Sequence, residues 1–201
     1  MVGEENSKTF LLHSELPAYE SNRLGKDVNG GFNEQSSRKI LLHKEDSGLF
    51  GYFVEYLYRS KWLAHKQVER DSDYIILARL YALGERLQAH QFQLATLRKF
   101  TSSLTSQMSL SDQGICDLLD VACAELPERI NEDPLRAHIF WYATSQLTRL
   151  QKYDYFLRLL GIHEDLGKYL CIRAGNSSVP QPTRPSEPLP ERFRPESIYH
   201  A

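Results

Sequence analysis

The sequence contains few cysteines and no long apolar stretch, and each absence excludes a class of protein. Its 201 residues include three cysteines, an odd number without CxxC spacing. A zinc site needs closely spaced ligand pairs and a secreted disulfide framework needs an even set, so we interpret Cys116, Cys123 and Cys171 as reduced core thiols. The apolar runs are too short to span a bilayer, and the polar start lacks the apolar centre of a signal peptide. We therefore expect a cytoplasmic or nuclear protein without a membrane segment.

Charge and catalytic motifs are equally sparse. The net charge is −2 and no basic run stands out, so we expect neither nucleic acid nor an acidic membrane as a partner. The sequence has no GxSxG, HExxH, P-loop or GxGxxG motif. His13 and His43 lie near serine and acidic residues, but such neighbours are common and do not define a triad. We predict no catalytic residue, no cofactor and no metal site, and keep an enzyme that uses either histidine as a third hypothesis.

The strongest pattern in the sequence is an amphipathic helix over residues 49–62. Asp46 or Ser47 stands where an N-cap would begin it. Its apolar residues recur at helical spacing: Phe50, Phe53, Val54, Leu57 and Tyr58. A helix face this apolar is not stable in water, so the segments before and after the helix must cover it. The remainder of the chain is therefore expected to pack around this helix.

Two short segments upstream are predicted to be strands. KTFLLH at residues 8–13 places Phe10 and Leu12 on one face, and RKILLH at residues 38–43 places Ile40 and Leu42 on one face. Between them we expect a short helix over residues 14–24, with Pro17 in its first turn, and a glycine-rich loop over residues 25–31.

Downstream of the central helix the pattern becomes wholly helical. A helix over residues 73–87 and another over 91–104, joined by a short turn, predict an antiparallel hairpin. Gly84 costs about 1 kcal/mol relative to alanine inside a helix, so we expect a closely packed neighbour there. Ser111 and Asp133–Pro134 begin two further helices. Shorter helices follow over residues 153–160 and 164–172.

The end of the chain changes composition at residue 175. Six of the nine prolines lie between Pro180 and Pro195, among serine, arginine and glutamate. Such a tail buries too little apolar surface to order itself, so we predict disorder. A polyproline ligand for another domain is the alternative, although the PxxP spacing lacks a clean context.

The order of these elements resembles the BTB/POZ family, with a departure at the start. The residues that carry the resemblance are Phe10–His13 followed by Leu16, Ala18 and Ser21, then Phe32–Glu34 before Ile40 and Leu42, then Phe50 with Leu57–Tyr58, then Leu80–Leu87. The match covers about residues 1–105 and is most similar to uncharacterised BTB proteins of filamentous fungi. Only Met1–Gly3 stand where the family has its first strand, so we expect a truncated strand, and a dimer with a second BTB chain by the family's usual route would lack that strand.

The resemblance implies a fold and a division of the chain. It implies an α+β fold with a small sheet flanked by helices over residues 1–105, an all-helical extension over 106–174 and the proline-rich tail over 175–201. It also implies that the ring of His13 is structural, buried and hydrogen-bonded.

Function follows from the same resemblance. In family members that serve cullin-type ubiquitin ligases, a hydrophobic-x-Glu loop contacts the cullin, and Phe32 and Glu34 match it by type and place. The alternative is that this loop folds onto the core of its own domain. Trp62 is the aromatic residue expected to be exposed for a partner. We predict a protein–protein interaction module, with a cullin–RING ligase adaptor as its more specific form and a self-associating scaffold or transcriptional co-regulator as the alternative.

Overall fold

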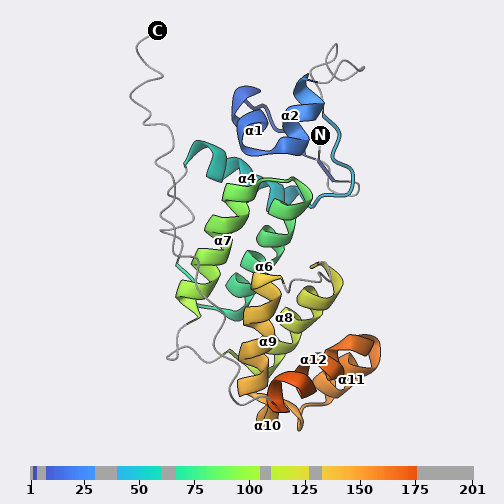
Figure 1. Ribbon diagram of the computed structural model, residues 1–201. Coiled ribbons are helices and arrows are strands. Elements are labelled where there is room, and N and C mark those ends of the chain that lie inside the picture. The colour runs from blue at the N-terminus through green and yellow to red at the C-terminus, as the bar shows by residue number, and fades with distance from the viewer. Residues whose placement is uncertain are drawn as a thin grey trace.

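The computed structural model describes residues 2–3, 8–29, 40–59, 67–104, 110–126 and 133–175. Helices account for 74% of these residues and bridge positions for 2%. The described helices are α1 (Glu15–Glu20), α2 (Asn22–Asn29), α4 (Ser47–Tyr58), α6 (Asp71–Arg86), α7 (His90–Ser103), α8 (Asp112–Ala124), α9 (Pro134–Ser145), α10 (Leu147–Leu150), α11 (Asp154–Ile162) and α12 (Glu164–Gly175). They form an elongated body with α1 and α2 at one end and α10 to α12 at the other (Figure 1).

The predicted α+β fold with a small sheet is wrong. Over the residues described, strand pairing is limited to two isolated bridges, Val2 with Lys8 and Val2 with Leu42. The period of two in residues 8–13 has another cause, because it reflects one-sided packing on a helix. The ring of Phe10 lies 5.2 Å from that of Phe50 on α4, edge to face, while Leu11 is 93% exposed. An extended segment can bury alternate residues in this way without a neighbouring strand.

The predicted helical hairpin is present as α6 and α7, but it, and not the helix over residues 49–62 as predicted, is the centre of the body. The two helices run side by side in Figure 1, and the turn between them includes Gln88 with a positive φ of 54°, a usual way to end a helix. A Cβ atom added to Gly84 would lie 3.1 Å from Cα of Gln93 on α7. The expectation of a closely packed neighbour at Gly84 is therefore confirmed, and the neighbour is the backbone of α7.

Helix α4 packs on this hairpin with a face that differs from the predicted one. Its cap is as expected, because Asp46 accepts a hydrogen bond from the N–H of Leu49 at 2.8 Å. Phe53 and Tyr56 are buried, and both rings lie about 5 Å from Phe92 of α7. Tyr58, predicted to be on the apolar face, is 46% exposed. The buried stripe thus follows positions 50, 53 and 56, and Tyr58 at the end of α4 faces outward.

The N-terminal helices form a tight pair instead of a helix followed by a loop. The predicted loop over residues 25–31 is wrong for residues 25–29, since α2 continues to Asn29. Gly25 permits the pair to close, because a Cβ atom there would lie 2.8 Å from the carbonyl oxygen of Ala18. The break between the helices falls at Ser21, whose backbone is extended. Its hydroxyl donates to the carbonyl of Leu87 and so fastens the pair to the end of α6.

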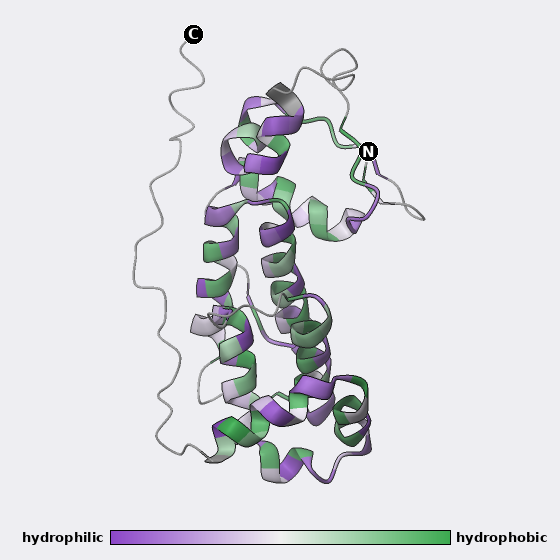
Figure 2. Ribbon diagram, turned by 45° about the vertical axis from the view of Figure 1, so that its right-hand side comes forward, coloured by the Kyte–Doolittle hydropathy of each residue, from purple (hydrophilic) through white to green (hydrophobic). Residues whose placement is uncertain are grey.

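The C-terminal helices begin where the sequence predicts. Ser111 caps α8 by accepting from the N–H of Gly114, and Asp133 caps α9 by accepting from Leu135 and Arg136. The other oxygen of Asp133 accepts from the hydroxyl of Tyr81 at 2.9 Å, which joins α9 to α6. Hydrophilic and hydrophobic residues alternate along these helices in Figure 2, as expected of amphipathic helices around a shared core. The predicted boundary at residue 105 and the predicted tail beyond residue 175 lie outside the described residues.

Candidate interaction surface

The three residues predicted to contact partners, Phe32, Glu34 and Trp62, all lie outside the described residues. A candidate site has to be built from the remainder of the chain. The described surface exposes seven large hydrophobic side chains, which are Leu11, Tyr19, Leu41, Tyr58, Leu157, Ile162 and Ile172. Leu11 and Leu41 lie on the two segments before α1 and α4, Tyr19 lies on α1 and Tyr58 on α4, and the other three lie on α11 and α12. Large exposed apolar side chains are the feature that most needs an explanation.

The N-terminal surface, defined by Leu11, His13, Leu41 and Tyr58, is built on two extended segments and α4. Val2 is 3% exposed and bridges Lys8 on one side and Leu42 on the other, so the two segments lie on either side of it. Leu42 is buried and its neighbour Leu41 is 50% exposed. Side chains alternate between two faces along an extended chain. The side chains of Val2 and Leu42 face the core, so those of Leu11 and Leu41 face away from it.

A histidine–tyrosine pair holds this surface to α4. The backbone N–H of His13 donates to the hydroxyl oxygen of Tyr58 at 3.1 Å, and Nδ1 of the His13 ring lies 2.9 Å from that oxygen. The two rings also meet edge to face at 5.8 Å between centroids. The prediction of a hydrogen-bonded His13 is therefore confirmed, whereas the prediction of a buried ring is wrong, because His13 is exposed.

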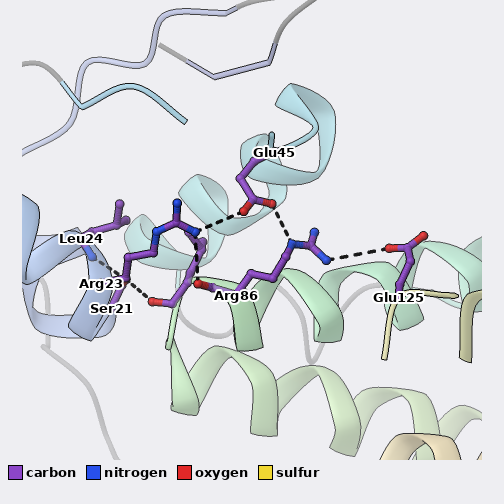
Figure 3. Close-up of polar contacts among 7 residues, drawn as sticks. Ser21, Arg23, Leu24, Glu45, Arg86 and Glu125 are labelled. Atoms are coloured by element: carbon purple, nitrogen blue, oxygen red, sulfur yellow. Dashed lines mark hydrogen bonds and ion pairs between the residues drawn. The ribbon is translucent and has the colours of Figure 1, made fainter. Parts of the chain in front are cut away.

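A buried carboxylate links the N-terminal helices to the remainder of the body (Figure 3). Glu45, whose side chain is 3% exposed, lies 3.4 Å from Arg23 of α2 and 2.9 Å from Arg86 of α6. Arg86 also approaches Glu125 at 4.0 Å, and Arg79 binds the same glutamate at 3.0 Å. The network therefore crosses from α2 through α6 to the end of α8. It fixes the segment that carries Leu41 and Leu42 relative to the helices.

A shallow, open depression adjoins this network but has no catalytic arrangement. It has a volume of about 340 Å³ and lies between the ends of α6 and α8. Its lining residues are Ala82, Glu85, Arg86, Ala124, Glu125 and Leu126. The charged groups Arg86 and Glu125 already pair with each other, and the lining contains no nucleophile or histidine. The depression therefore offers little for acid–base or covalent chemistry.

The pKa of the buried Cys116 thiol also argues against covalent chemistry at this residue. Burial, with smaller contributions from Asp117 and Asp112, raises the pKa of the Cys116 thiol to about 12, so this thiol stays protonated and is a poor nucleophile. Within the ranges described, no three His, Cys, Asp or Glu side chains gather to hold a metal ion. No helix in the same ranges is long and apolar enough to cross a membrane.

Reasoning from the sequence missed the N-terminal surface. The signal was present, because the LLH ending occurs in both extended segments and alternation already placed Leu11 on the outer side. Both segments were expected to lie within a sheet, which directed attention away from their exposed residues. Comparisons with family models, with curated proteins and with solved structures found no match to this chain.

Proposed function

We propose that this protein is a protein-binding module and that the N-terminal surface is one of its contact sites. The observation that carries the proposal is the exposure of large apolar side chains on three neighbouring segments, with Leu11 at 93%, Leu41 at 50% and Tyr58 at 46%. Apolar side chains held in place on a rigid support are typical of interaction sites, because covering them removes apolar area from water. The His13–Tyr58 pair and Val2 supply that support.

The surface can be tested by charge substitution. The double variant Leu11→Asp with Leu41→Asp should lose the proteins that the wild-type chain retains in affinity purification from cells. A matched control is Leu157→Asp with Ile162→Asp, which alters exposed leucine and isoleucine side chains at the opposite end. Retention of the same proteins by the wild type and the N-terminal variant would remove this surface from the proposal. Equal loss in both variants would point to nonspecific apolar capture.

The adaptor role in a cullin–RING ligase is the more specific form of the proposal. Its support is the family resemblance and the match of Phe32 and Glu34 to the cullin-contact pattern. It predicts that the purified chain co-elutes with a cullin N-terminal domain, and that Phe32→Ala with Glu34→Ala weakens the complex. Unchanged co-elution of the double variant would remove these two residues, and absence of co-elution would remove the role.

A self-associating scaffold is the second candidate, and the exposed residues at both ends of the body favour it. Leu11 precedes α1, which lies at one end of the body, while Leu157, Ile162 and Ile172 belong to α11 and α12 at the other end. A chain with two apolar ends can join copies head to tail or end to end. Light scattering should then give a mass above 23.2 kDa at high concentration. A strict monomer would count against this candidate.

A further inference from the structure

We draw no further inference here: the strongest candidate, the outward surface of α11 and α12 with the exposed side chains of Leu157, Ile162 and Ile172, is an apolar face for which nothing in the structure shows what covers it.

Discussion

The carboxylate of Glu45 lies 2.9 Å from Nε of Arg86, and the Glu45 side chain is 3% exposed. Arg23 approaches the same carboxylate from α2 at 3.4 Å. Taking a carboxylate out of water costs several kcal/mol unless cations and hydrogen bonds compensate it. Glu45 is therefore the point through which the N-terminal helices are fastened to α6.

Replacing Glu45 by glutamine should lower the free energy of unfolding by about 1–3 kcal/mol. The loss stays below that of a fully buried pair because the side chains of Arg23 and Arg86 are 42% and 38% exposed and remain screened by water. Urea denaturation measures the change. The control is Glu55→Gln, which breaks an exposed pair with Arg59 and should cost about 0.5 kcal/mol or less. Equal stability of the two variants would show that the Glu45 pairs contribute nothing.

Gly84→Ala should destabilise the α6–α7 hairpin although alanine is the better helix former. The added Cβ would lie 3.0 Å from Cβ, 3.1 Å from Cα and 3.2 Å from N of Gln93, and a backbone cannot retreat as a side-chain tip can. Forcing the helices apart should cost about 1–3 kcal/mol, more than the roughly 1 kcal/mol gained in helix propensity. Thermal denaturation measures the result.

The matched control for Gly84 is Gly161→Ala on α11. An added Cβ there meets nothing within 4 Å, so the gain in propensity is not opposed and should be up to about 1 kcal/mol. The two substitutions are chemically identical and should shift the melting temperature in opposite directions. A shift of the same sign in both would contradict the close packing at Gly84.

Local rules predicted the helix starts well because the information is contained in a few adjacent residues. Asp46, Ser111 and Asp133 each accept from N–H groups two or three residues later, which is the geometry that a cap requires. The α6–α7 turn was likewise readable, since apolar periodicity stops and restarts within a few residues. None of these predictions depended on a distant part of the chain.

The sheet could not be predicted correctly because alternation does not reveal what covers the apolar side. Phe10 packs against Phe50, forty residues away in sequence, and this contact gives the same period of two as strand pairing. Similarly, nothing in the sequence pairs Glu45 with Arg86, or the carboxylate of Glu20 with the N–H of Phe92 at 2.9 Å. The exposed Leu11 and Leu41 became a candidate site only when the neighbouring elements were in place.

Stability should fall as the pH rises above 9, because three buried groups resist losing their protons. Burial raises the pKa of Cys116 from 9.0 to about 12, and those of Tyr56 and Tyr74 from 10.0 to about 12. The unfolded chain releases these protons near the ordinary values, so between pH 9 and 12 the native state binds more protons than the unfolded state. The free energy of unfolding then decreases by up to about 1.4 kcal/mol per pH unit for each group.

Cys116→Ala separates the thiol from the tyrosines in this pH dependence. Only the thiol titrates early in the unfolded chain, so the variant should lose less stability than the wild type between pH 9 and 10. Cys171→Ala, at an exposed position, should follow the wild type over the same interval. Urea midpoints at pH 8, 9 and 10 provide the comparison. A wild-type chain equally stable at all three values would contradict the prediction.

Arg98→Met should raise the free energy of unfolding, whereas Glu45→Gln should lower it. All three guanidinium nitrogens of Arg98, on α7, are buried and have no hydrogen-bond partner among the residues that the structure describes. A buried cation without a partner opposes folding, whereas methionine retains most of the aliphatic length and needs no solvation. The gain should be about 1–2 kcal/mol, which corresponds to a rise of about 2–8 °C in melting temperature for a chain of this size.

The control is Arg59→Met, at an exposed position, which should change the free energy of unfolding by about 0.5 kcal/mol or less. A lower melting temperature for Arg98→Met would show that the guanidinium has an anionic partner in solution, and α7 would then become a second place to look for a ligand.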